Sequence, residues 1–137
     1  MTEASIRRWL IKLLKNQPIK LQPIESGSTG LGIPDLYFRA AKQGGWVEFK
    51  VARMNEAGEI KLRWEPGQLN WIKEHAELNG KTFLFIGIRP TDLLMVLVLN
   101  QFCMVYANVD PLIEAMHYIQ EMKFISREKM LGILNTY

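Results

Sequence analysis

Apolar residues recur at helical spacing in four segments of the chain. In residues 2–14, Ile6, Leu10 and Leu14 share one stripe with two further apolar positions, and Thr2 precedes them as a suitable N-cap. The same spacing predicts three more helices, at residues 65–78, 110–122 and 126–137. We therefore expect the chain to begin with one helix and to end with two.

Six other runs, rich in apolar and β-branched residues, predict strands. One is expected at a sheet edge, because Pro18 and Pro23 cannot donate to a ladder. Another, the run "KTFLFIGI", is apolar at nearly every position, as is typical of a strand buried on both faces. The expected strands are residues 18–25, 35–40, 46–51, 81–88, 93–99 and 102–107, the last two forming a hairpin that turns at Asn100-Gln101.

The order of these elements predicts the fold class. Strands come singly and in pairs between the helices, so the chain lacks the regular alternation of a doubly wound fold. The prediction is an α/β fold in which a mixed central sheet is flanked by helices. At 137 residues, the chain is expected to form a single domain with a sizeable core.

Composition adds little to this picture. The net charge of +3 mildly favours an anionic partner, although many basic proteins have none. The single cysteine, Cys103, lies in an apolar run and is expected to be buried rather than bridged. We find no signal-peptide pattern, and the longest apolar run, residues 93–99, is too short to span a bilayer. We expect a cytoplasmic protein without a membrane partner.

The predicted hairpin at residues 35–51 contains the charged residues that suggest chemistry. Side chains alternate between the two faces of a strand, so Glu48 and Lys50 project from the same face. The partner strand begins at Asp35, directly after Pro34, whose fixed φ restricts the start of the strand. Pairing through the glycine turn can bring Asp35 close to Glu48 at one end of the sheet.

Two neighbouring carboxylates repel each other and raise each other's pKa, and a hard divalent cation removes that conflict. Mg²⁺ binds through one or two carboxylates and takes its remaining ligands from water and substrate phosphate. An isolated Glu-x-Lys is more often a solvated ion pair on a polar face. The combination of Asp35, Glu48 and Lys50 on one hairpin of a basic protein favours a metal site instead.

The motifs "GIPDL" and "WVEFK" resemble the PD-(D/E)XK nuclease superfamily and, within it, the VRR-NUC group of small nucleases. The resemblance runs from about residue 3 to residue 88 and includes the glutamine of "EPGQLNWI". It implies a restriction-endonuclease-like fold that binds Mg²⁺ or Mn²⁺ and cuts DNA phosphodiesters. It further implies that Asp35, Glu48 and the backbone carbonyl of Phe49 are metal ligands, that Lys50 is the catalytic lysine, and that Gln68 faces the site.

Other polar residues have weaker assignments. The VRR-NUC group has a glutamate in its first helix, and Glu3 matches that position, so the resemblance makes Glu3 the preferred additional metal ligand. Glu25 is the competing candidate, and Glu3 could instead serve the helix dipole, as first-turn acids commonly do. Arg53, Lys61 and Arg63 follow the Glu48 strand and are candidate phosphate contacts, although such charges are often merely solvated.

The resulting hypothesis is a metal-dependent DNA endonuclease, selective for branched DNA such as four-way junctions and acting as a homodimer. Junction resolution needs two cuts, and closed two-fold symmetry supplies two equivalent sites. The alternatives are a catalytically silent nucleic-acid-binding module and a protein-interaction domain on the same fold. We expect a single nuclease domain over residues 1–137, with its core in about 1–107 and a C-terminal helical addition in about 108–137.

Overall fold

The computed structural model describes residues 1–24, 32–100 and 116–137. Its strands form one six-stranded sheet in which spatial order follows chain order. The helices and strands are α1 (Glu3–Leu13), β1 (Lys20–Pro23), β2 (Leu36–Arg39), β3 (Gly44–Arg53), α2 (Gln68–Glu77), β4 (Thr82–Arg89), β5 (Leu93–Leu99), β6 (Met116–Glu121), the 3₁₀ turn η1 (Met122–Phe124) and α4 (Arg127–Thr136).

The sheet is mixed, as the sequence predicts. Strands β3 and β4 pair in parallel, and every other neighbouring pair is antiparallel. The parallel pair requires a crossover connection, and α2 lies in that connection. Strand β4 is buried along its whole length except for Arg89, which explains its nearly continuous apolar sequence.

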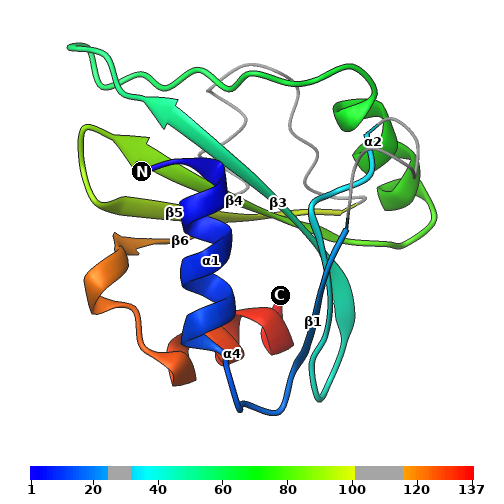
Figure 1. Ribbon diagram of the computed structural model, residues 1–137. Helices are drawn as coiled ribbons and strands as arrows, with labels where there is room; N and C mark the ends of the chain where they lie inside the picture. Colours follow the sequence, from blue (N-terminus) through cyan, green and yellow to red (C-terminus); the bar gives the residue numbers. More distant parts are fainter. Residues whose placement is uncertain (25–31, 101–115) are drawn as a thin grey trace.

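Helices cover both faces of the sheet, and each face has its own apolar core. On one face, α1 and α4 pack against the inward-facing residues of β2 to β5, and Figure 1 shows both helices on that side of the sheet. The other face is covered by α2 and by residues 54–64, which lead from β3 toward it. The predicted arrangement of a mixed sheet flanked by helices is therefore confirmed.

The N-terminus is fixed in place by several local contacts. Thr2 caps α1 as predicted, and its hydroxyl oxygen accepts a hydrogen bond from the Ser5 amide at 3.0 Å. The Arg89 side chain donates to the carbonyl oxygen of Met1. Gly87 of β4 leaves no room for a side chain, because an added Cβ would lie 2.7 Å from Ile6 and closer still to Met1. The first turn of α1 therefore packs directly against the sheet.

The prediction of a helix over residues 110–122 is wrong for its second half, because residues 116–121 form strand β6. Strand β5 is buried at every position after Leu93, and its second edge needs hydrogen-bond partners that β6 supplies. This pairing overrides the helical spacing of the apolar residues. The expected strand at residues 102–107 and its turn lie outside the described residues.

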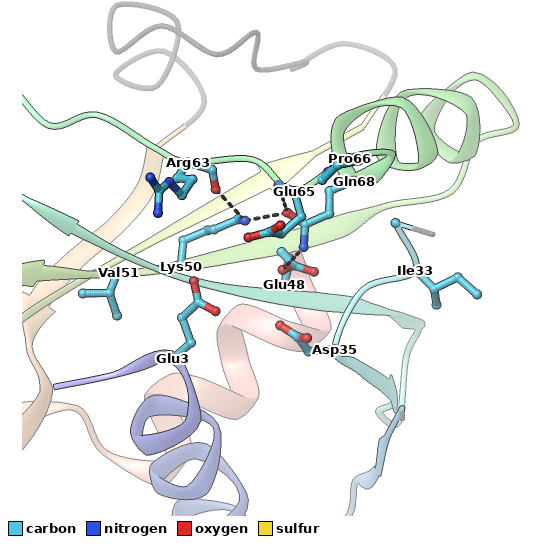
Figure 2. A pocket seen from close by; sticks show the side chains of 11 residues that line it. Glu3, Ile33, Asp35, Glu48, Lys50, Val51, Arg63, Glu65, Pro66 and Gln68 are labelled. Carbon is cyan, nitrogen blue, oxygen red and sulfur yellow. Dashed lines mark hydrogen bonds between the residues drawn. The ribbon is translucent and has the colours of Figure 1, made fainter. Parts of the chain in front are cut away.

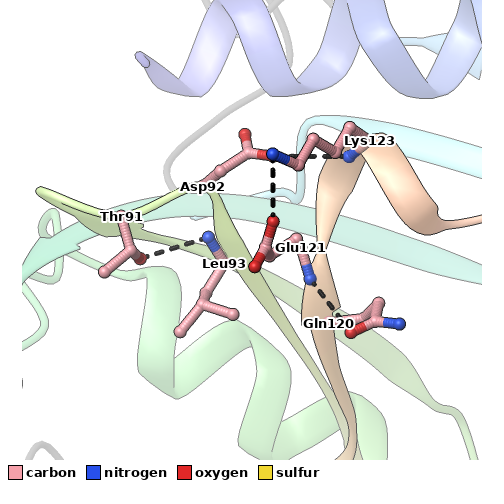
Figure 3. Close-up of polar contacts among 6 residues, drawn as sticks. All are labelled: Thr91, Asp92, Leu93, Gln120, Glu121 and Lys123. Carbon is pink, nitrogen blue, oxygen red and sulfur yellow. Dashed lines mark hydrogen bonds and ion pairs between the residues drawn. The ribbon is translucent and has the colours of Figure 1, made fainter.

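Hydrogen bonds hold the start of β5 against the end of β6 (Figure 3). The Asp92 carboxylate accepts from the Lys123 amide at 3.3 Å. Outside the residues drawn there, the Asp92 carbonyl accepts from the Met122 amide at 2.9 Å. Thr91 closes the preceding turn, since its hydroxyl accepts from the Leu93 amide at 3.1 Å. The chain after β6 is thus fixed relative to the sheet.

The last helix belongs to the same core as the first. Ser126 caps α4 as predicted, and three residues of α4, Met130, Ile133 and Leu134, are buried against the α1 side of the sheet. In the part of the chain that the structure describes, no helix has the length and apolar character needed to cross a bilayer. The division into a core and a C-terminal addition stays a prediction.

If α4 is part of the core, Leu134→Ala lowers the free energy of unfolding by about 2–5 kcal/mol, as large-to-small changes in packed cores do. Gly132→Ala in the same helix is the control. An added Cβ there meets nothing within 4 Å, so this change leaves stability unchanged or raises it by up to about 1 kcal/mol. Urea denaturation of both variants measures the difference, and equal effects would contradict the assignment.

Candidate active site

The site begins where β2 separates from β3. Their register ends at the pair Leu36 and Val47, so the next residues of β3 have no β2 partner. The Asp35 carboxylate takes the place of the missing strand and accepts a hydrogen bond from the Phe49 amide at 3.2 Å. Because the amide and carbonyl of one strand residue point to the same edge, the Phe49 carbonyl also faces this gap.

The gap opens into a cleft of about 480 Å³. Figure 2 shows Glu48 and Lys50 on one side of β3, with Asp35 and Glu3 approaching from neighbouring segments. The cleft thus collects side chains from α1, the start of β2, β3 and the start of α2. Its lining is Glu3, Gly32, Ile33, Asp35, Glu48, Lys50, Val51, Arg63, Glu65, Pro66 and Gln68.

Glu48 is the most perturbed group in the cleft. Its side chain is 2% exposed, and its Oε2 atom has no hydrogen-bond partner. Burial raises the pKa of Glu48 to about 9, and the negative charges of Asp35 and Glu3 act in the same direction. Lys50 opposes this shift without cancelling it. Such a group favours a bound proton or a bound cation.

Gln68 connects Glu48 to Lys50. Its amide nitrogen donates to Glu48 Oε1 at 2.9 Å, and its Oε1 accepts from Lys50 Nζ at 2.6 Å. Lys50 Nζ also donates to the Arg63 carbonyl at 2.7 Å and lies 5.0 Å from the centre of the Trp64 ring. The ammonium is therefore fixed beside the carboxylates by groups from two segments. The predicted proximity of Gln68 to the site is observed.

Glu3 lies in the cleft at the first turn of α1. Burial raises the pKa of Glu3, Lys50 lowers it, and the charges of Asp35 and Glu65 raise it further. These interactions place its carboxylate in the same electrostatic environment as the other acids. Glu25, the competing candidate, lies outside the described residues, so the choice between the two stays a prediction.

Two glycines fix the distance between Asp35 and Gln68. Gly32 precedes the Ile33-Pro34-Asp35 segment, and Gly67 is the N-cap of α2; their φ angles are 89° and 85°. A Cβ at Gly32 would lie 2.2 Å from the Gly67 carbonyl oxygen. Backbone therefore packs on backbone at this point, which only glycine allows. The sequence motifs "GIPD" and "PGQ" meet through this contact.

The predicted basic residues divide into two groups. Arg63 lines the cleft, whereas Arg53, at the exposed end of β3, and Lys61 do not. Sequence reasoning missed Glu65 and Trp64, which directly precede the Pro-Gly that starts α2. Their position in the sequence next to Gln68 could have indicated both residues, because the turn that places Gln68 in the cleft also brings Glu65 there and Trp64 beside Lys50.

The donor set of the cleft suits a hard divalent cation. Among the described residues, no three carboxylate, imidazole or thiolate side chains are placed to hold a metal ion. Asp35 and Glu48, with the Phe49 carbonyl, match instead the one or two carboxylates that Mg²⁺ uses, and Glu48 Oε2 is free to bind one. A ligand role for Glu3 stays a prediction.

Comparison with known proteins supports the fold. No protein-family profile and no curated protein matches the chain. The fold is similar to that of a Holliday junction resolvase. This solved structure, Hjc of the archaeal hyperthermophile Archaeoglobus fulgidus, has a TM-score of 0.51, with 10% sequence identity over 77% of this chain and 83% of the resolvase. The chain therefore has a restriction-endonuclease-like fold, as predicted.

The pKa of Glu48 gives a prediction for protein kept in EDTA. Between pH 4.5 and about 9 the unfolded chain has lost a proton that folded Glu48 keeps, so the free energy of unfolding falls as the pH rises. Glu48→Gln removes most of this decrease in stability with pH, whereas Glu77→Gln, at an exposed position, does not. Urea denaturation at several pH values between 4.5 and about 9 measures the free energy of unfolding of each protein. Parallel curves for wild type and Glu48→Gln would show that Glu48 ionises normally.

The glycine contact gives a second prediction. Gly32→Ala lowers the free energy of unfolding by more than about 1 kcal/mol, because it adds both a strained φ and a clash with Gly67. Gly58→Ala is a matched control, since Gly58 has a φ of 80° but an open surrounding. Thermal or urea denaturation compares them, and a Gly58 variant at least as destabilised would exclude a special contact at Gly32.

Proposed function

We propose that this protein is a metal-dependent DNA endonuclease that hydrolyses phosphodiester bonds. The observation that carries the proposal is the buried, partnerless oxygen of Glu48, beside Asp35 and a fixed Lys50 in an open cleft. Buried polar atoms in folded proteins rarely lack a hydrogen-bond partner, so a buried carboxylate oxygen without one favours a ligand that binds there. A protein that only bound DNA would need cations, and not paired carboxylates.

Five residues at the cleft have a role in the proposed reaction. Asp35, Glu48 and the Phe49 carbonyl would hold Mg²⁺ or Mn²⁺, and the bound ion would neutralise charge on the phosphodiester. Water attacks phosphorus and gives up one proton, the bond to the leaving oxygen breaks, and that oxygen takes up a proton from water, so that no proton is gained or lost overall. The Lys50 ammonium stabilises the negative charge that develops on the phosphate. Gln68 holds Lys50 and Glu48 in their relative orientation.

The substrate class is proposed from the fold and the motifs together. The structural neighbour is a Holliday junction resolvase, and "GIPDL" with "WVEFK" resembles the VRR-NUC group. We therefore propose that the chain belongs to this group and prefers branched DNA such as four-way junctions. Arg63 on the cleft rim is suited to contact a phosphate next to the cut, and Arg53 and Lys61 are proposed to contact phosphates farther away.

Cleavage of a synthetic four-way junction with Mg²⁺, Mn²⁺ or EDTA tests the function. We expect cutting with either cation and none with EDTA. Asp35→Asn, Glu48→Gln and Lys50→Ala each reduce the rate by at least about a hundredfold, because each removes a charge that the reaction needs.

Two exposed residues of α2 supply matched controls for that assay. Glu77→Gln removes a carboxylate and Lys73→Ala removes an ammonium, both outside the cleft. We expect both controls to cut at the wild-type rate. Wild-type protein that leaves every DNA uncut with both cations, or a Glu48→Gln variant as fast as its control, would refute the assignment.

We further propose that two chains act together as a homodimer, because one chain offers one cleft and junction resolution needs two cuts. Strand β5, although apolar, offers no surface to a second chain, since every residue of it after Leu93 is buried within this chain. Light scattering at micromolar concentration is expected to give twice the chain mass of 15.9 kDa, with the junction cut faster than a matched linear duplex. A monomer that cuts both DNAs equally would contradict the proposal.

A further inference from the structure

A second pocket lies on the same face of the sheet as the cleft, beyond the end of α2. It has a volume of about 290 Å³ and differs from the cleft in its chemistry. No carboxylate lines it, whereas four acidic residues line the cleft. Aromatic and basic side chains take their place, chiefly Tyr37, Arg39, Trp46, His75 and Lys81. We call this the aromatic pocket.

The aromatic pocket continues the cleft along the same two strands. Side chains two residues apart share a face, so Tyr37 and Arg39 follow Asp35 along β2, and Trp46 precedes Glu48 along β3. Two residues of a strand span about 7 Å. A chain of nucleotides with one phosphate at Glu48 therefore reaches the aromatic pocket with its neighbouring nucleotides.

The rings of the pocket form a braced and partly exposed cluster. Tyr37 meets the edge of Trp46, Trp46 meets Trp71, and His75 stacks on Trp71 with centroids 5.3, 5.3 and 4.9 Å apart, respectively. All four residues are half-buried. Burial also lowers the pKa of His75, which keeps its ring uncharged at neutral pH. The cluster thus offers a rigid aromatic surface that its own core does not fully cover.

Two glycines pack closely against these rings. An added Cβ at Gly80 would lie 2.2 Å from His75 Nε2, and one at Gly44 would lie 3.1 Å from the Tyr37 hydroxyl. The pocket wall is therefore backbone at these two places. A side chain at either position would crowd the ring that it meets.

Positive charge surrounds the rings. Arg39 is exposed and has no ion pair within the described part of the chain. Lys20 lies opposite it on β1 and is also exposed. Lys81 Nζ lies at the pocket and donates to Gln43 at 2.7 Å and to the backbone oxygen of Tyr137. Aromatic rings next to the exposed Arg39 cation match the two parts of a nucleotide, a flat base and a phosphate.

We propose that the aromatic pocket binds an unpaired nucleotide of the DNA strand that enters the cleft, with its base against Tyr37 and its phosphate beside Arg39. The proposal rests on the proposed nuclease function in assuming that the bound strand is the one cut. A base inside a duplex is stacked on its neighbours and cannot present its face to the protein. The pocket would therefore favour DNA with splayed or unpaired nucleotides next to the cut.

Binding in EDTA tests the proposal without any cleavage. The probes are a blunt duplex and the same duplex with an unpaired tail of about eight nucleotides that carries 2-aminopurine. We expect the wild-type protein to bind the tailed DNA more tightly and to quench the 2-aminopurine fluorescence, because the base stacks on an aromatic ring. Equal affinity for both DNAs, with no quenching, would overturn the proposal.

Variants locate the effect. Tyr37→Leu reduces affinity for the tailed DNA about tenfold and weakens quenching, whereas Tyr37→Phe keeps the aromatic face and both signals. Arg39→Ala lowers the slope of log affinity against log salt concentration by about 1, because it removes one phosphate contact. Lys15→Ala, directly after α1, leaves this slope unchanged. Circular dichroism checks that each variant is folded. If Tyr37→Leu is unfolded, the binding of tailed DNA by Arg39→Ala alone tests the proposal. Wild-type binding by Arg39→Ala and by folded Tyr37→Leu would overturn the proposal.

The two proposals fail in different ways. If the wild-type protein cuts DNA with Mg²⁺ but Tyr37 and Arg39 do not affect binding of the tail, the aromatic pocket is wrong and the nuclease stands. If no DNA is cut but tail binding depends on both residues, the pocket stands and the nuclease function is wrong.

Discussion

The separation of β2 from β3 is the constraint on which the rest of the site depends. Once β2 stops pairing, β3 would have an unsatisfied amide at Phe49, and the Asp35 carboxylate satisfies it. The same geometry turns the Phe49 carbonyl toward Asp35 and leaves room for Glu48 to face an open cleft. One local change in strand pairing therefore creates both the donor set and the space for a substrate.

The surrounding fold keeps mutually repelling groups close together. Gly32 packs on Gly67 and so fixes Asp35 relative to Gln68, while Gly87 allows the first turn of α1 to carry Glu3 to the cleft. Backbone contacts of this kind cannot relax without moving whole elements. The fold consequently holds the carboxylates close together and away from water. Desolvation and charge repulsion both disfavour their ionised forms there, as the raised pKa of Glu48 shows. A bound cation would relieve that opposition.

Local sequence patterns predicted most of the fold and the centre of the site, because both depend on short spacings. Strand alternation placed Glu48 with Lys50, and turn residues placed Asp35 beside them. The strand at residues 116–121 was missed, since its apolar spacing also suits a helix and only pairing with β5 decides between them. The aromatic pocket was missed as well. Tyr37, Trp46 and His75 come from three elements, and no single stretch of sequence shows that they meet.

The position of Mn²⁺ in crystals of the protein tests the central claim, that Asp35 and Glu48 form a divalent-cation site, most directly. Anomalous diffraction from crystals soaked in Mn²⁺ identifies the ion independently of any activity. We predict a peak within about 2.0–2.6 Å of oxygens from Asp35, Glu48 and the Phe49 carbonyl. A saturating soak that leaves the cleft without a peak, with Glu48 still bound only to Gln68, would contradict the claim.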